Sequence, residues 1–156
     1  MSITDVKIKK AELRDIETLN NISVESKMYW NYPQEWIDNW MSDLTLTEEH
    51  FKEQYIYKLE REDLIIGFCS IVENQNEYEI TDLWLIPKYI GKGYGKLLLN
   101  ETIKRVVKKD KEVIVESDPN SEAFYSSQGF KTFDRKESYP KGRFLPLMKK
   151  VSKTIL

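Results

Sequence analysis

The sequence predicts an α+β domain with a mixed, mostly antiparallel central sheet flanked by helices. Three runs with strand character, Tyr55–Leu59, Leu64–Glu73 and Tyr78–Ile86, are separated only by short polar breaks, which favours an antiparallel meander. A helical stretch then separates Tyr78–Ile86 from the apolar run Val113–Val115. A helix that joins two strands in this way makes them parallel neighbours. We therefore expect one layered domain over residues 1–156.

The segment before the meander is predicted to form one strand and three helices. Val6–Lys10 alternates apolar and charged residues, which indicates a strand. Leu13–Lys27 carries apolar residues at about the helical period. Pro33 suits the start of a second helix, and Thr47 suits the start of a third.

The segment after the meander is predicted to alternate between helices and strands. A helix over Gly93–Lys109 would pack its apolar face on the sheet. Val113–Val115 is continuously apolar, as is typical of a strand buried on both faces. A short helix over Ser121–Ser127 and two strands, Phe130–Glu137 and Arg143–Val151, complete the fold.

The composition is that of an ordinary globular protein and argues against several functions. The 156 residues are 40% hydrophobic and 32% charged with a formal net charge of −2, so no basic field predicts binding to nucleic acid. No apolar run is long enough to span a membrane, and we expect no membrane association. His50 and Cys69 are the only residues of their types, so we expect no metal site and give neither a role. A single cysteine fits a reducing compartment, which predicts a cytoplasmic location.

Three of the six glycines lie close together, between a predicted strand and a predicted helix. They are Gly91, Gly93 and Gly95. Such a stretch leaves backbone N–H groups unpaired at the positive end of the helix dipole, which favours a phosphate or pyrophosphate. Lys92 and Lys96 add positive charge beside it. The alternative is a tight turn whose glycines only permit close packing.

The two common phosphate-binding motifs do not match this cluster. The dinucleotide motif G-x-G-x-x-G would need glycine at Lys96 or, one frame later, at Leu98. The P-loop motif would need glycine at Ile90 and Ser or Thr at Leu97. A nucleotide-dependent phosphotransferase is therefore disfavoured.

Two blocks of the sequence resemble the GCN5-related N-acetyltransferase (GNAT) family. The first is Ile90-Gly91-Lys92-Gly93-Tyr94-Gly95, which is similar to the family motif Q/R-x-x-G-x-G/A but has isoleucine at its first position. The second is the segment 118–130, which follows after the expected helix and strand. Its matching residues are Asn120, Ala123, Phe124, Tyr125, Gly129 and Phe130.

The resemblance implies a site for acetyl-CoA where two parallel strands splay apart. The pantetheine arm would pair with the backbone of Leu85 and Ile86 like an added strand, and Asn120 would hydrogen-bond the same arm. The backbone amides of the glycine cluster would hold the pyrophosphate. This set comprises Gly91, Lys92, Gly93, Tyr94, Gly95 and Lys96.

The resemblance also implies direct attack of an amine on the thioester of acetyl-CoA. Tyr125 matches the residue that protonates the leaving sulfur, although it could instead be a core aromatic beside Phe124. A carboxylate or an ordered water must take the amine proton. Strand alternation places Glu79 and Asp82 on opposite faces, so that only one faces the acceptor. We prefer Glu79, and Glu116 or a solvent-exposed role for Glu79 are the alternatives.

The acceptor site is expected to lie near the first helices and the last hairpin. Tyr139 and Arg143 fall in the connection between the final strands, where Arg143 could pair with a carboxylate, although a surface arginine is the more common outcome. An early aromatic group is expected to be mostly a packed helix face, with some rings lining the acceptor site. It comprises Tyr29, Trp30, Tyr32, Trp36 and Trp40.

The function predicted from these observations is transfer of acetyl from acetyl-CoA to a primary amine of a small molecule or a protein. The alternative is a non-catalytic domain of the same fold that binds or senses acyl-CoA, because a fold alone does not prove chemistry. The expected partners are acetyl-CoA and the amine acceptor. Family resemblance also allows a homodimer.

Overall fold

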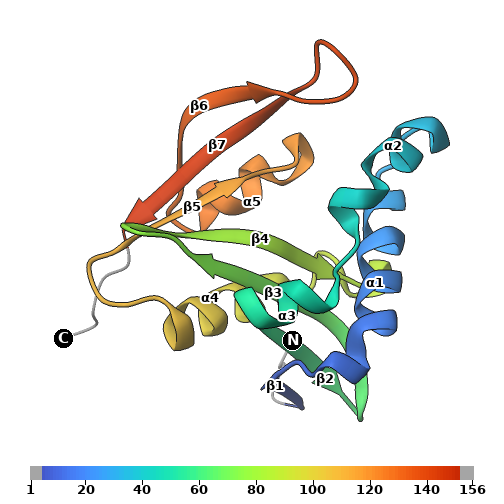
Figure 1. Ribbon diagram of the computed structural model, residues 1–156, viewed down its shortest axis with the longest axis vertical. Coiled ribbons are helices and arrows are strands. Elements are labelled where there is room, and N and C mark those ends of the chain that lie inside the picture. The colour runs from blue at the N-terminus through green and yellow to red at the C-terminus, as the bar shows by residue number, and fades with distance from the viewer. Residues whose placement is uncertain (1–4, 152–156) are drawn as a thin grey trace.

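A computed structural model describes residues 5–151 of the chain and shows one seven-stranded sheet (Figure 1). The strand order is β1-β2-β3-β4-β5-β7-β6. Only β4 and β5 run parallel among the described strands, and all other neighbours are antiparallel, as predicted. The strands are β1 (Val6–Lys10), β2 (Tyr55–Arg61), β3 (Leu64–Glu73), β4 (Glu77–Leu85), β5 (Glu112–Glu116), β6 (Lys131–Glu137) and β7 (Phe144–Val151).

Helices cover both faces of the sheet. One face is packed by Leu19 and Ile22 of α1, together with the segments that follow it, and the other by Leu98, Leu99 and Ile103 of α4. Both α1 and α4 contact the central strands β3 and β4. The helices are α1 (Ile16–Met28), α2 (Gln34–Leu44), α3 (Glu48–Glu53), α4 (Tyr94–Val106) and α5 (Glu122–Ser127), with 3-10 turns at Leu13–Asp15, Pro87–Tyr89 and Pro119–Ser121.

The helix starts follow from local sequence chemistry. Pro33 precedes α2, as expected from its fixed backbone angle. Thr47 caps α3, and the ring of His50 accepts a 2.8 Å hydrogen bond from the Thr47 N–H. Gly93 caps α4 with φ 91°, a conformation that few residues other than glycine adopt.

The predicted end of the helix after the glycine cluster is wrong. The helix predicted over Gly93–Lys109 ends at Val106, because Val107 already has extended backbone angles. Val107 is only 9% exposed and packs into the main core, so tertiary packing turns the chain inward at this point. Asp110 then takes a positive φ of 64° in the turn that leads to β5.

The parallel pair β4–β5 stays together for only part of its length. Pairing runs from Glu77 with Glu112 to Ile80 with Val115 and then stops. Residues 81–85 of β4 therefore have an open edge toward β5, where unpaired backbone groups can meet a ligand.

A bulge in β4 changes which side chains share a face. Ser70 of β3 pairs with Asp82 and the next residue, Ile71, pairs with Ile80, which leaves Thr81 without a partner. An extra residue of this kind reverses the alternation beyond it. Leu83 accordingly packs in the same core as Ile80.

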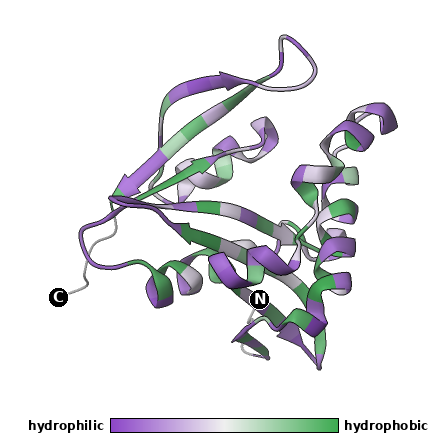
Figure 2. Cartoon of the chain, viewed as in Figure 1, coloured by the Kyte–Doolittle hydropathy of each residue, from purple (hydrophilic) through white to green (hydrophobic). Residues whose placement is uncertain are grey.

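The hydropathy of the chain follows this layering (Figure 2). Apolar residues of β3, β4 and β5 meet α4 in the main core, whereas all seven residues of β6 are exposed, and this edge strand is largely purple in the figure. A separate small core of Ile37, Trp40 and Leu44 joins α2 to Trp84 and Tyr139. This small core holds α2 against the open end of the β4–β5 pair.

Candidate active site

Two cavities meet where β4 and β5 separate. One has a volume of about 390 Å³ and the other about 530 Å³. Trp84 and Asp118 line both of them, so these two side chains mark the junction. A ligand in one cavity could therefore react with a ligand in the other at this junction.

The smaller cavity contains the glycine cluster and the N-terminus of α4. Gly91 and Gly93 both have a positive φ, of 80° and 91°. The first helical hydrogen bond of α4 runs from Leu97 N to Gly93 O at 3.2 Å, so the N–H groups of residues 94–96 have no acceptor within the helix. These N–H groups and the helix dipole make this end of the cavity suitable for an anion. The backbone pattern expected from the sequence is present.

Most of the predicted coenzyme-binding residues are brought together in the smaller cavity. Six of the nine line it: Leu85, Gly91, Gly93, Gly95, Lys96 and Asn120. Lys92 does not, and Tyr94 is only 2% exposed, with its ring against Tyr89. Ile86 donates its N–H to Ile66 and accepts from Tyr89 N, so both of its backbone groups have partners within the protein. The geometry thus favours Leu85 over Ile86 as the residue whose backbone could pair with the pantetheine arm.

The two aromatic residues of α5 point in different directions. Phe124 lines the smaller cavity, whereas Tyr125 lines neither cavity and is 5% exposed. The ring of Tyr125 lies between Phe124 and Phe130, at centroid distances of 5.2 and 5.4 Å. Burial, with added repulsion from Cys69 and Asp82, raises the pKa of Tyr125 far above its usual value. The phenol therefore stays protonated at neutral pH.

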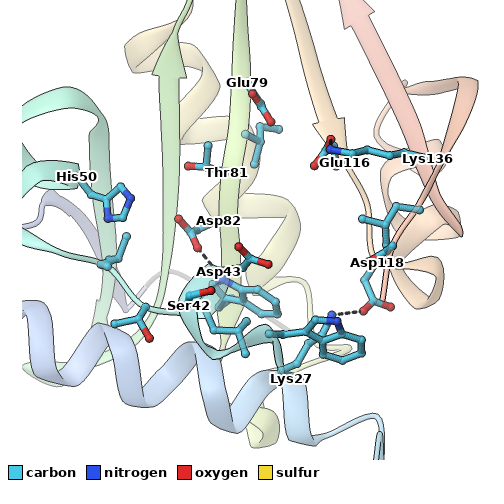
Figure 3. Close-up of a pocket in the computed structure, with 18 of the residues that line it drawn as sticks. Lys27, Ser42, Asp43, His50, Glu79, Thr81, Asp82, Glu116, Asp118 and Lys136 are labelled. Carbon is cyan, nitrogen blue, oxygen red and sulfur yellow. Dashed lines mark hydrogen bonds and ion pairs between the residues drawn. The ribbon is translucent and has the colours of Figure 1, made fainter. Parts of the chain in front are cut away.

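The larger cavity is rich in carboxylates (Figure 3). Glu116 is paired with Lys136 at 2.9 Å, and Asp118 is paired with Lys27 and Arg143. The other four carboxylates that line it have no ion pair among the described residues. They are Asp43, Glu79, Asp82 and Glu137. An excess of negative charge in a partly enclosed site favours a cationic ligand.

The bulge at Thr81 overturns the prediction that Glu79 and Asp82 lie on opposite faces. Both carboxylates line the larger cavity, together with Thr81 itself (Figure 3). Simple alternation fails because the extra residue in β4 shifts the pleat by one position. The choice between the two as a base therefore depends on their surroundings and not on their face.

The two β4 carboxylates differ in environment. Asp82 is 8% exposed, and burial raises its pKa to about 6 even though Trp84 Nε1 donates a 3.0 Å hydrogen bond to it. Burial also raises the pKa of Glu79, with further repulsion from Glu116. A carboxylate that titrates near neutral pH is well suited to proton transfer. Asp82 thus has the properties expected of a base, whereas the sequence-based preference was for Glu79.

A buried ion cluster at the junction was not expected in full from the sequence. Asp118 accepts hydrogen bonds from Lys27 Nζ and, at 3.1 Å, from Arg143. The side chains of all three are at most 11% exposed. Both cations also lie over the ring of Trp40, at 4.5 Å for Lys27 and 4.4 Å for Arg143. The pairing of Arg143 with a carboxylate was only the less common alternative in the sequence, and the rest of the cluster was not expected, because the three residues come from distant parts of the chain.

The early aromatic group is divided between packing and lining. Tyr32, Trp36 and Trp40 pack against one another, and Trp40 also lines the larger cavity. Trp30 lines the smaller cavity instead. His50, which was given no role, is half-buried and lines the larger cavity.

Two further findings concern residues 5–151 only. No helix there combines the length and the apolar character needed to cross a membrane. No group of three or more His, Cys, Asp or Glu side chains in this part of the chain is arranged to hold a metal ion.

Comparison with known proteins agrees with the fold. The family model "Acetyltransferase (GNAT) domain" matches residues 14–151. The chain is 27% identical over 151 residues to a spermidine N(1)-acetyltransferase of Thermoplasma acidophilum, covering 83% of this chain and 90% of that protein. It is 32% identical over 94 residues to the [ribosomal protein bS18]-alanine N-acetyltransferase of Haemophilus influenzae, covering 57% of this chain and 64% of that one.

A solved structure is similar along almost the whole chain. It is the PaiA N-acetyltransferase of T. acidophilum in complex with coenzyme A, with a TM-score of 0.74 and 25% identity. The match covers 97% of this chain and 99% of that one.

Proposed function

The chain belongs to the GNAT family of acetyltransferases, and from this premise we propose that it transfers acetyl from acetyl-CoA to a primary amine of a small polycationic acceptor. The observation that carries the proposal is the meeting of two unlike cavities at Trp84 and Asp118. One offers unpaired N–H groups to an anion, and the other offers unpaired carboxylates to a cation.

The smaller cavity would hold the coenzyme. The amides of the glycine cluster would bind the pyrophosphate at the N-terminus of α4. The pantetheine arm would run along the open edge of β4 near Leu85, where β5 has already turned away. Its thioester would then reach the junction at Trp84.

The larger cavity would hold the amine. A free alkyl amine has a pKa of about 10.4 and arrives as an ammonium ion, which the carboxylates of this cavity would attract. Asp82 would take one proton from it, with Glu79 as the second candidate, either directly or through a water molecule. The neutral nitrogen would then attack the thioester carbonyl carbon.

The reaction would end with cleavage of the carbon–sulfur bond. The nitrogen of the tetrahedral intermediate would lose its second proton to solvent, and the intermediate would expel the thiolate. The thiolate would take a proton from an acid, which solvent would then reprotonate. Tyr125 is the proposed acid because of its place in the second sequence block and because its phenol stays protonated. Its side chain lines neither cavity, so its hydroxyl would have to reach the sulfur from the cavity wall beside Phe124. The products would be the N-acetylated amine and CoA. General acid–base assistance of this kind contributes typically ~10²–10⁴-fold to the rate.

The surplus of carboxylates supports a polycation over a monoamine. Asp82 suffices for the reacting nitrogen, and Asp43, Glu79 and Glu137 remain for further ammonium groups. The name of the T. acidophilum relative, a spermidine N(1)-acetyltransferase, agrees with this choice. The second relative acts on a protein alanine by its name, which makes an N-terminal peptide the alternative acceptor.

The test has two stages. Acetyl-CoA and CoA should raise the melting temperature, whereas ATP at the same concentration should not. Thiol release should then be measured with spermidine, putrescine, propylamine and an alanine-terminated peptide. We expect the highest kcat/KM with the first two and a lower kcat/KM with propylamine. Stabilisation by CoA without thiol release from any amine would support the alternative, a non-catalytic acyl-CoA-binding domain.

A cytoplasmic location and a homodimer stay predictions.

A further inference from the structure

Two hydrogen bonds of Tyr32 determine the direction in which the Asn120 amide points. The Tyr32 hydroxyl donates to the carboxylate of Asp118, at 2.9 Å to Oδ1 and 3.0 Å to Oδ2. Asn120 Nδ2 donates to the same hydroxyl oxygen at 2.9 Å, and Arg143 donates to it at 3.3 Å. A hydroxyl has one proton, and an ionised carboxylate cannot donate. The Tyr32 oxygen must therefore act as acceptor toward Asn120, and the amide nitrogen must face Tyr32.

This arrangement depends on Asp118 being ionised. Burial opposes ionisation, but the Lys27 ammonium and the hydrogen bonds to the carboxylate outweigh it and lower the pKa of Asp118 below its usual value. Arg143 adds a second cation at 3.1 Å. The backbone N–H of Asn120 also donates to Asp118, at 2.8 Å. The carboxylate thus fixes Asn120 twice, once through its backbone and once through Tyr32.

Asn120 lines the smaller cavity, so the orientation of its amide determines which polar atom a ligand there can meet. With its nitrogen committed to Tyr32, the amide has only its carbonyl oxygen left for a partner. Among residues 5–151 that oxygen accepts no hydrogen bond from the protein. A ligand in the cavity would therefore be met by an acceptor and must supply a donor.

We propose that Tyr32 is a positioning residue that holds the Asn120 carbonyl oxygen toward an amide N–H of the pantetheine arm. This inference rests on the proposed function, because it takes the ligand of the smaller cavity to be CoA. Tyr32 itself lines neither cavity and acts through Asn120. Its position in the connection between α1 and α2 also links the coenzyme site to the helices beside the acceptor cavity.

The experiment compares two ligands that differ in the pantetheine arm. Binding of CoA and of its nucleotide part, 3′-phospho-ADP, is measured by calorimetry for the wild type and for Tyr32→Phe. We expect CoA to bind about three- to tenfold more weakly to the variant, which is the effect of one hydrogen bond. Affinity for the nucleotide part should not change. Tyr55→Phe is the matched control, because Tyr55 also donates to a carboxylate, Glu73, but lines neither cavity.

A double-mutant cycle tests whether Tyr32 acts through Asn120. In an Asn120→Ala background, Tyr32→Phe should weaken CoA binding by little more than Asn120→Ala alone. If Tyr32→Phe weakens CoA binding as much in the Asn120→Ala background as in the wild type, the proposal is overturned, because Tyr32 would then act by another route. Asn120→Ala with unchanged CoA affinity would also overturn it, whether or not Tyr32→Phe folds. Neither result would touch the proposed function, which fails only if the wild type does not bind CoA or transfer acetyl.

Discussion

Trp84 Nε1 donates a hydrogen bond of 3.0 Å to Asp82, across the part of β4 that follows the bulge. The bond orients a carboxylate that burial would otherwise leave poorly solvated, and the pKa of Asp82 still rises to about 6. Trp84 lies at the junction of the two cavities. The pair therefore places a group that titrates near neutral pH beside the point where thioester and amine would meet.

The first prediction concerns the pH dependence of turnover. Because Asp82 must be ionised to accept a proton, kcat/KM should fall as the pH drops through about 6 in the wild type. Asp82→Asn should lower kcat/KM by ~10²–10⁴-fold and remove this acid limb. Glu79→Gln is the comparison variant. If Glu79→Gln removes the limb and Asp82→Asn keeps it, Glu79 is the base and Asp82 is not.

The second prediction concerns stability. The pKa of Asp82 is about 6 in the folded protein, against 3.8 for an unperturbed aspartate, so the folded state holds this proton more tightly. The resulting stability is fully present below pH 3.8 and is lost as the pH rises through about 6. Asparagine imitates the neutral acid at every pH. In urea unfolding, the free energy of unfolding of Asp82→Asn should rise relative to that of the wild type between pH 4 and 7, by at most about 3 kcal/mol. A difference that is independent of pH would contradict the burial argument.

The third prediction concerns the acid. Tyr125→Phe should lower kcat by about 10²-fold, because the leaving thiolate would lose its proton donor, and it should change CoA affinity little, because the ring that packs between Phe124 and Phe130 is kept. Stability should change little, since its hydroxyl has no hydrogen-bond partner within residues 5–151. Tyr78→Phe is the control, because Tyr78 is a buried tyrosine of the same core with no contact to either cavity. Unchanged turnover in Tyr125→Phe would assign the proton to another donor.

The fold could be predicted almost completely because its elements follow local patterns. Alternation, helical period and capping residues such as Thr47 are properties of neighbouring residues. The exception, the end of α4 at Val106, is a case in which packing of Val107 in the core overrides the local pattern.

The site could be predicted only where it is contiguous in sequence. The glycine cluster is one segment, so its backbone geometry and its place before α4 were accessible. The bulge at Thr81 arises from pairing with β3 and has no local signal, which is why alternation misplaced Glu79 relative to Asp82. The link of Asp118 to Lys27 spans 91 positions, and no pattern in the sequence indicates it.

The fourth prediction contrasts alanine at Gly95 with alanine at Gly91. A Cβ at Gly95 would meet Leu85 and Phe124 at 3.6 Å, an ordinary contact, and alanine favours a helix by up to about 1 kcal/mol over glycine. The melting temperature of the ligand-free protein should therefore hold or rise, and CoA affinity should change little, because the family motif that this segment resembles admits alanine at this position. Gly91→Ala is the contrast, since its Cβ meets nothing within 4 Å but its φ is 80°, and it should lose stability. A large loss of CoA affinity in Gly95→Ala would show that the added methyl group intrudes on the coenzyme.

The fifth prediction concerns the acceptor. Asp43 and Glu79 line the larger cavity without ion pairs among the described residues, so they are available to ammonium groups that do not react. The double variant Asp43→Asn/Glu79→Gln should raise KM for spermidine by about tenfold and change KM for propylamine much less, because only the polyamine carries further charges. The difference should shrink at high ionic strength. Glu101→Gln on α4, which removes a carboxylate outside both cavities, should affect neither amine. An equal rise of KM for both amines would show that these carboxylates do not distinguish polyamines, and the acceptor would then have to be sought among monoamines or N-terminal peptides.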